Sequence, residues 1–229
     1  MARPKPDPEQ VFPEILSAAI ELIREQGFDR LTMKALAQTC GMSVGKLYHF
    51  VPSKDALFLH LEIDYFDRLT SHLQQAMQTC NVSAAGLCQL PARARFMAVI
   101  SGYFEFAIAH LDLYKLVTSP PKVFSHYRGT ESEQLAQREL LAALSTINVC
   151  RELYLLARSE AGLQNDEDEA QAEFLLCING LHGLILLSQS SAWPYIAASP
   201  AEIQRQQGTP VAATDQIQAQ LERLITKLL

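Results

Sequence analysis

Residues 30–57 read RLTMKALAQTCGMSVGKLYHFVPSKDAL, and this stretch decides the fold. It offers three places where a helix can begin, because Thr32, Ser43 and Ser53 each carry a hydroxyl that can cap the first turn of the run that follows. Between the first two, Gly41 follows Cys40 at the position where a residue in the left-handed conformation ends a helix. The pattern predicts two short helices joined by a tight turn, which is a helix-turn-helix.

A helical period of apolar residues continues on both sides of this motif. Upstream, the pattern predicts a first helix that ends at Gln26. Pro8 could begin it, but Pro13 would then lie inside the helix and cost a hydrogen bond, so we prefer a start near Phe12–Pro13, after a Pro-rich arm over residues 1–10. Downstream, the pattern predicts helices over about 54–79, 91–110, 131–161, 167–192, 200–207 and 215–228, and a short turn at 112–117. No segment has the alternation typical of a strand, so the sequence predicts an all-α fold. Its N-terminal three-helix helix-turn-helix domain (1–56) is joined by a long helix to a helical C-terminal domain (57–229).

The charge distribution bears on the kind of partner. The chain of 229 residues has a net charge of −6, which by itself disfavours nucleic-acid binding. Residues 1–60, however, have as many basic as acidic residues, and residues 30–54 contain four basic residues and no acidic one. Because a DNA-binding face needs local positive charge and not a basic protein, the motif remains compatible with DNA.

Cysteine usage and hydropathy bear on the compartment. The five cysteines form no CxxC pair, and no apolar leader follows the first basic residues, so we expect a reduced, cytoplasmic protein. The most apolar stretch, residues 174–188, is about 15 residues long, whereas a membrane-spanning helix needs about 20. We therefore expect a buried helix there and no membrane contact.

The sequence also disfavours an enzyme or a metalloprotein. It has no glycine-rich phosphate loop, no nucleophile elbow and no paired histidine and acid signature. The histidines lack the i, i+4 spacing of metal ligands. We accordingly predict no catalytic residue, no cofactor and no metal site.

The second helix of the motif, Val44–Phe50, is the one that would enter the major groove. Gly45 costs a helix about 1 kcal/mol relative to alanine, and such a residue makes sense where the backbone comes close to DNA. Lys46 and His49 share one face, and the Tyr48 hydroxyl can reach a phosphate. The free N–H groups behind the three caps are further anion sites. The predicted DNA-binding residues are Thr32, Lys34, Ser43, Val44, Gly45, Lys46, Tyr48, His49 and Lys54, and the predicted core residues are Leu36, Ala37, Leu47 and Phe50.

These residues resemble the tetracycline-repressor (TetR) family of bacterial regulators over about residues 12–60. The matching run is Gly27-Phe28, Leu31-Thr32, Leu36-Ala37, Cys40-Gly41-Met42-Ser43, Gly45-Lys46-Leu47-Tyr48, Pro52-Ser53-Lys54 and Leu57. One departure follows Tyr48, where the family usually has an aromatic residue or histidine and then phenylalanine. This chain has Phe50 and Val51 there. Either Val51 fills the place of the anchoring phenylalanine less fully, or Phe50 substitutes for it.

The resemblance implies a homodimer that binds an inverted repeat in double-stranded DNA. It also implies a C-terminal domain that binds a small-molecule effector of unknown identity and thereby releases the DNA. On this basis the chain is expected to be a transcriptional repressor. An activator or a ligand-independent regulator of the same fold is the alternative. A nucleoid-type architectural protein is less favoured, because it would be expected to be more basic.

Two surfaces of the C-terminal domain are candidates for ligand binding and dimerisation. Polar and aromatic residues interrupt the apolar helices between residues 91 and 190, as in a pocket between helices, although each could instead face solvent or the dimer seam. The candidate ligand residues are Tyr103, Asn148, Arg151, Tyr154 and Asn179. Helices 167–192 and 215–228 have wide apolar faces that could form a four-helix bundle across a two-fold axis. The candidate interface residues are Ala170, Leu176, Gly180, Gly183, Leu184, Leu187, Leu221, Leu224, Ile225 and Leu228.

Overall fold

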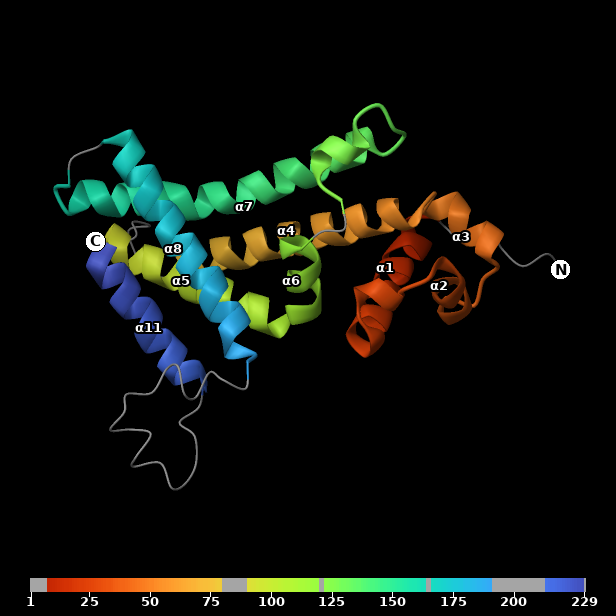
Figure 1. The fold of residues 1–229 in the computed structure, drawn as a ribbon, viewed down its shortest axis with the longest axis horizontal. Helices are drawn as coiled ribbons and strands as arrows, with labels where there is room; N and C mark the ends of the chain where they lie inside the picture. The colour runs from red at the N-terminus through yellow and green to blue at the C-terminus, as the bar shows by residue number, and fades with distance from the viewer. Residues whose placement is uncertain (1–7, 80–89, 120–121, 164–165, 191–212, 229) are drawn as a thin grey trace, which may run out of the picture. The chain divides into compact units, whose positions relative to one another are not determined.

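The computed structural model describes residues 8–79, 90–119, 122–163, 166–190 and 213–228, and in these residues every regular element is a helix (Figure 1). The α-helices are α1 (Pro8–Gln26), α2 (Met33–Thr39), α3 (Val44–Phe50), α4 (Lys54–Thr79), α5 (Ala92–Ala109), α6 (Leu111–Thr118), α7 (Glu133–Glu160), α8 (Glu167–Ser188) and α11 (Ala213–Leu228), and the 3-10 turns are η1 (Phe28–Arg30) and η2 (Phe124–Tyr127). The predicted all-α fold is confirmed. The helix predicted over 200–207 lies outside the described residues.

The chain folds as two units. The first comprises Met1–Arg68 and His110–Thr146, and the second comprises Leu69–Ala109 and Ile147–Leu229. Helices α4 and α7 therefore each contribute to both units. The division differs from the predicted domains 1–56 and 57–229, which remain a prediction about function.

Helix α1 begins at Pro8, so the predicted start at Phe12–Pro13 is wrong. A proline at the first helical position costs nothing, because the N–H that it lacks would have no partner there. Pro13 inside the helix does cost one backbone hydrogen bond. Packing in the turn before Pro13 offsets that cost: Val11 is buried, and the Phe12 ring lies edge-on to His60 with 4.7 Å between ring centroids.

In the first unit, α1 packs against α2 and α6, and α2 packs against α3. Apolar side chains of this unit are almost fully buried; they include Ile15, Ala19, Ile23, Leu31, Leu36, Ala37, Leu47 and Leu57. A second cluster joins α4, η2 and α7 through Leu59, Tyr127 and Ala136. The 3-10 turn η2, which lies just before α7, thus buries the Tyr127 side chain.

Glu62 is a buried carboxyl in this unit, 5% exposed. Burial, together with the nearby carboxyl of Glu139, raises the pKa of Glu62 from 4.5 to about 8. The folded state therefore keeps this proton up to about pH 8, whereas the unfolded chain releases it near pH 4.5. The stability that this proton contributes is complete below pH 4.5 and is lost as the pH rises to 8.

Glu62→Gln should therefore stabilise the protein at pH 8 and not at pH 4.5, because glutamine resembles the protonated acid at every pH. We expect the free energy of unfolding at pH 8 to rise by roughly 2–4 kcal/mol relative to the native protein. Denaturant titrations between pH 4.5 and pH 8 measure the difference. The exposed Glu152→Gln on α7 is the control. Parallel stability profiles for native protein and Glu62→Gln would contradict the prediction.

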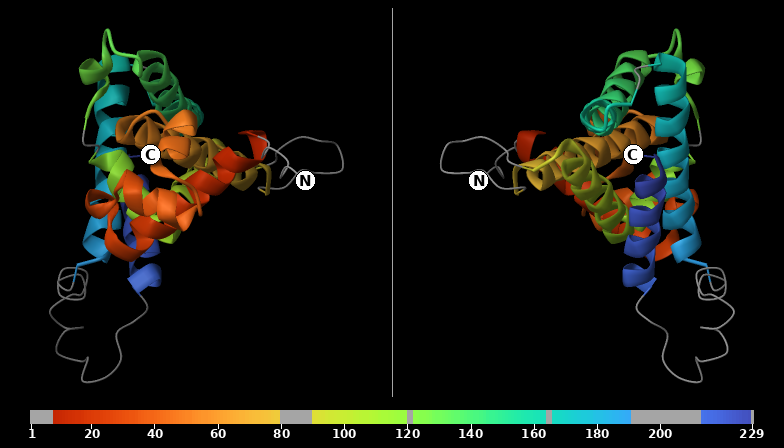
Figure 2. Two further views of the ribbon diagram at one scale, coloured as in Figure 1. Left: turned by 90° about the vertical axis from the view of Figure 1, so that its right-hand side faces the viewer. Right: turned by 90° about the vertical axis from the view of Figure 1, so that its left-hand side faces the viewer.

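In the second unit, α5, α8 and α11 pack against one another, and Figure 2 shows α11 beside α8. Tyr154 of α7 joins them: its ring centroid lies 5.5 Å from that of Phe96 and 5.7 Å from that of Phe174. The Tyr154 hydroxyl donates a hydrogen bond of 2.6 Å to Oε2 of Glu173 on α8. The buried tyrosine thereby connects three helices.

Helices α7 and α8 are both more apolar than we expect from the single stretch at residues 174–188. Each contains an 18-residue window of high mean hydropathy, so by length and composition both could cross a membrane. Helices α5 and α6 also pass this test when they are taken together as one broken span. The predicted apolar stretch at 174–188 lies in α8, whose first turn is acidic. Only part of this stretch is buried within one chain, so the expectation of a buried helix is only partly met.

Candidate functional site

The three predicted helix caps are confirmed. Oγ1 of Thr32 accepts a hydrogen bond of 3.1 Å from the Ala35 N–H, and Oγ of Ser43 accepts one of 3.2 Å from the Lys46 N–H. Oγ of Ser53 accepts one of 3.0 Å from the Ala56 N–H. Each hydroxyl satisfies an N–H group that has no partner within its helix, and so fixes the residue at which that helix begins.

The turn between α2 and α3 is set by Gly41. Its φ is 61°, the left-handed conformation that the sequence predicts. The Gly41 N–H donates to the Gln38 carbonyl at 3.0 Å, and the Met42 N–H donates to the Ala37 carbonyl at 2.9 Å. This pair of bonds is the Schellman motif, which ends α2 and directs the chain into α3.

Helix α3 presents one face to solvent. Val44 and Tyr48 are 37% and 45% exposed, and Gly45, Lys46 and His49 are also exposed. The opposite face is held by Leu47, which is fully buried. A short helix that is anchored on one side and leaves its basic and hydroxyl-bearing side chains in solvent can enter the major groove of DNA.

The other predicted DNA-binding residues surround this face at neighbouring helix starts. Thr32, Lys34 and Ser43 are exposed. Lys54 is half-buried, and its ammonium group lies 5.1 Å from the centroid of the Phe58 ring. Their role in DNA contact remains a prediction.

Val51, and not Phe50, is the anchor after α3. Val51 is fully buried, whereas Phe50 is half-buried, so the assignment of Phe50 to the core is wrong. The Val51 N–H donates a 2.9 Å hydrogen bond to the Leu47 carbonyl and closes the last turn of the helix. The smaller valine therefore takes the buried position that follows the recognition helix.

Gly45→Ala should separate folding from DNA binding. A Cβ at Gly45 would meet no atom within 4 Å, so the fold itself does not require glycine there. We expect the free energy of unfolding to rise by about 1 kcal/mol, because alanine is the better helix former. If the backbone approaches DNA at this point, affinity should fall several-fold. Denaturation and DNA titration of one preparation measure both quantities. The control is Gln38→Ala, at an exposed position on α2. Unchanged DNA affinity in Gly45→Ala would contradict the prediction.

Cys40, at the end of α2, is half-buried. Burial, and to a lesser extent the carboxylate of Glu14, raise the pKa of its thiol. Because the thiolate is the reactive form, this environment disfavours oxidation at the motif.

The five candidate ligand residues lie in different surroundings. Tyr103 and Tyr154 are buried, and the Tyr103 ring centroid lies 5.8 Å from that of His182. Asn148, Arg151 and Asn179 are exposed on α7 and α8. Their role in ligand binding remains a prediction.

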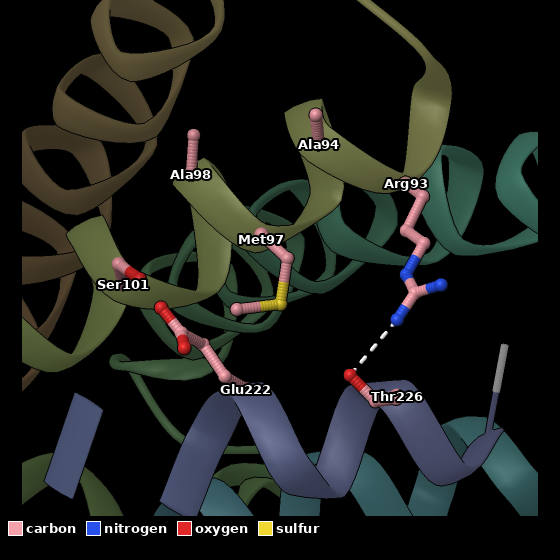
Figure 3. A pocket seen from close by; sticks show the side chains of 7 residues that line it. All are labelled: Arg93, Ala94, Met97, Ala98, Ser101, Glu222 and Thr226. Atoms are coloured by element: carbon pink, nitrogen blue, oxygen red, sulfur yellow. Dashed lines mark hydrogen bonds between the residues drawn. The ribbon is translucent and has the colours of Figure 1, made fainter. Parts of the chain in front are cut away.

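A pocket that the sequence analysis missed lies between α5 and α11 in the second unit (Figure 3). Its volume is about 470 Å³, within the range of small-molecule sites. The lining residues are Arg93, Ala94, Met97, Ala98 and Ser101 of α5 and Glu222 and Thr226 of α11. Only the two charged residues stand out in the sequence, and nothing local indicates that α5 and α11 are neighbours.

The candidate interface residues divide by burial. Ala170, Leu221 and Ile225 are already buried within one chain, so the interface that we propose below leaves them out. Leu176 is 60% and Leu187 39% exposed. Gly180, Gly183 and Leu184 are half-buried, and the side chains of Leu224 and Leu228 lie outside the described set. Further exposed leucines, which the sequence analysis missed, are Leu175 and Leu186 on α8 and Leu155 and Leu156 on α7.

Comparison with known proteins agrees with this geometry. Residues 15–61 match the family model of bacterial regulatory proteins, tetR family. The HTH-type transcriptional regulator UidR of Escherichia coli (strain K12) is 34% identical over 64 residues, which are 28% of this chain and 33% of UidR. The match thus spans about a third of that relative.

Solved structures extend the likeness to the whole fold. The TetR family transcriptional regulator PfmR from Thermus thermophilus has a TM-score of 0.59 at 14% identity, covering 93% of this chain and 97% of PfmR. The transcriptional regulator FadR from Bacillus subtilis, solved in complex with stearoyl-CoA, has a TM-score of 0.59 at 13% identity, covering 95% of this chain and 97% of FadR.

Proposed function

We propose that this chain, whose residues 15–61 match the family model of bacterial regulatory proteins of the tetR family, binds an inverted repeat in DNA as a homodimer and represses transcription until a small molecule releases it. The observation that carries the proposal is the solvent-facing side of α3, where Lys46, Tyr48 and His49 are exposed on a helix anchored by Leu47 and Val51. In this role the chain is a regulator and not an enzyme.

A homodimer would place two copies of α3 in successive major grooves, about 34 Å apart. The half-sites would then be related by the same two-fold axis as the subunits, which is why we propose an inverted repeat. A ligand that favours another spacing of the two helices would lower DNA affinity by population shift.

We place the dimer contact on the exposed leucines of α8 and of the end of α7. Leu175, Leu176, Leu186 and Leu187 are between 39% and 60% exposed in one chain. Soluble proteins rarely leave contiguous apolar surface of this kind in water, and a second copy would cover it. Because a DNA-binding regulator must reach DNA, we place the protein in the cytoplasm and assign these faces to protein contact and not to a membrane.

Leu176→Glu with Leu187→Glu should convert the dimer to a monomer. The double change places two charges per subunit in an apolar contact, where desolvation without a partner is costly. Sedimentation equilibrium at micromolar concentration measures the mass. Leu163→Glu, an equally exposed leucine after the end of α7, is the control and should stay dimeric. A dimer that persists in the double variant would place the interface elsewhere.

We propose a small-molecule effector because the resemblance to the TetR family implies one. The structure of FadR from Bacillus subtilis contains stearoyl-CoA, so a fold of this kind can hold a small molecule. At 13% identity that likeness does not carry over a ligand.

Selection of bound DNA from a random library, followed by gel shift at fixed salt, tests the proposal. We expect one inverted repeat to be recovered, bound by two chains. Recovery of no preferred sequence at moderate salt would overturn the sequence-specific function and favour a DNA-binding protein of architectural type.

A further inference from the structure

The pocket between α5 and α11 contains two opposite charges that do not neutralise each other. Arg93 donates a hydrogen bond of 2.8 Å from Nη2 to Oγ1 of Thr226, a neutral partner. Glu222 lines the same pocket one helical turn before Thr226. Within the part of the chain that the structure describes, neither Arg93 nor Glu222 forms an ion pair. Both charges are thus available to a ligand.

The space between the charges is apolar. Figure 3 shows the Met97 side chain between Arg93 and Glu222, and Ala94 and Ala98 are on the same stretch of α5. These three side chains are half-buried. A molecule that lies along the pocket would therefore cover apolar surface in its middle and meet a charge at each end, which is the usual composition of a selective small-molecule site.

We propose that this pocket binds a small zwitterion with an aliphatic stem, whose carboxylate pairs with Arg93 and whose ammonium group pairs with Glu222. The planar guanidinium of Arg93 can donate two parallel hydrogen bonds to a carboxylate. The carboxylate of Glu222 accepts from an ammonium group. The binding site stands by itself, whereas its role as the effector site rests on the proposed function.

The helices set the spacing of the two charges. Glu222 and Thr226 are four residues apart on α11, a rise of about 6 Å, and Arg93 and Ser101 mark the two ends of the pocket on α5, a rise of about 12 Å. The ligand's charges should be separated by a distance between these limits. Several methylene groups must therefore lie between its carboxylate and its amine, which excludes an α-amino acid bound through its backbone groups alone.

Calorimetric titration of the full chain, without DNA, tests the site. The probes are 4-aminobutanoate, 6-aminohexanoate and 8-aminooctanoate, with hexanoate and hexylamine as the singly charged comparisons. We expect one of the two longer zwitterions to bind at least tenfold more tightly than either singly charged compound and than 4-aminobutanoate. Equal affinity for hexanoate, hexylamine and the zwitterions, or no heat for any of them at millimolar concentration, would overturn the proposal.

Charge reversal provides a second test. Arg93→Glu gives the pocket two carboxylates and should shift its preference to 1,6-diaminohexane. Glu222→Arg gives it two cations and should shift the preference to octanedioate. The double reversal should recover zwitterion binding in the opposite orientation. Arg223→Glu, an exposed reversal on α11 outside the pocket, should leave the preference unchanged. A preference that does not follow these reversals would overturn the assignment.

The two proposals can fail separately. Titration without DNA reports on the pocket whether or not the chain is a regulator. Adding the best zwitterion to a gel shift with the selected DNA then tests its role as effector. If the zwitterion releases DNA from the native protein and not from Arg93→Glu, that role is supported. Tight binding of the zwitterion with no effect on DNA binding would restrict the inference to a binding site.

Discussion

Lys46→Glu is expected to lower affinity for the selected inverted repeat about a hundredfold and to leave the unfolding temperature unchanged. Lys46 is exposed on α3, and its backbone N–H, not its side chain, takes part in the Ser43 cap. The fold therefore does not depend on its ammonium group. A lost base or phosphate contact costs about 1–3 kcal/mol, and a dimer loses two of them and gains two repulsive charges.

The salt dependence identifies the kind of contact. If Lys46 contacts a phosphate in each subunit, the slope of log affinity against log salt should fall by about two. Gel shifts at a series of salt concentrations measure this slope. Lys115→Glu, an equivalent reversal at an exposed position on α6, controls for the overall change in net charge. Equal losses in Lys46→Glu and Lys115→Glu would mean that α3 is not the DNA-binding surface.

The parts of the fold that depend on neighbouring residues were predicted to the residue. Helices α2, α3 and α4 begin at residues 33, 44 and 54, each directly after its predicted hydroxyl cap. A cap is a hydrogen bond between residues three apart, so the sequence itself contains both partners. The left-handed Gly41 is local in the same sense, because it needs only the carbonyls of the helix that it ends.

The start of α1 was not predictable in this way. Pro13 argues against a helix when it is read locally, and the contact that outweighs it joins Phe12 to His60 on α4. The same limit applies to Val51, whose burial depends on which helices surround it and not on its size or neighbours.

The functional surfaces show a related limit. The apolar stripe on α11 predicts that one face of this helix is buried. The sequence pattern is the same whether that face packs against α5 and α8 of its own chain or against a second chain. Leu221 and Ile225 prove to be buried within one chain, whereas Leu176 is exposed. The pocket at Arg93 and Glu222 likewise exists only because α5 and α11, far apart in the sequence, are packed together.

Arg158→Met is expected to lower the free energy of unfolding by about 3–5 kcal/mol, although methionine fills a similar volume. The Arg158 side chain is 2% exposed, and its guanidinium pairs with Glu173 and, at 3.3 Å, with Glu169 of α8. Glu173 also accepts the hydrogen bond from Tyr154. Removing the cation leaves the Glu173 carboxylate, whose side chain is 26% exposed, without its charged partner.

A double-mutant cycle separates this loss from lost packing. Arg158→Met combined with Glu173→Gln, measured beside each single change, removes both charges and keeps an amide oxygen that can accept the hydrogen bond from Tyr154. We expect this double variant to recover most of the stability, because no uncompensated carboxylate is left. Glu169→Gln should cost less than about 1 kcal/mol, since the Glu169 side chain is 60% exposed and water already solvates it. Urea titrations of the native chain and these variants at one pH measure each difference. If the double variant is no more stable than Arg158→Met, the loss of stability comes from the shape of the arginine side chain and not from the unpaired charge. The contacts of Arg158 between α7 and α8 would then stabilise the second unit by packing alone.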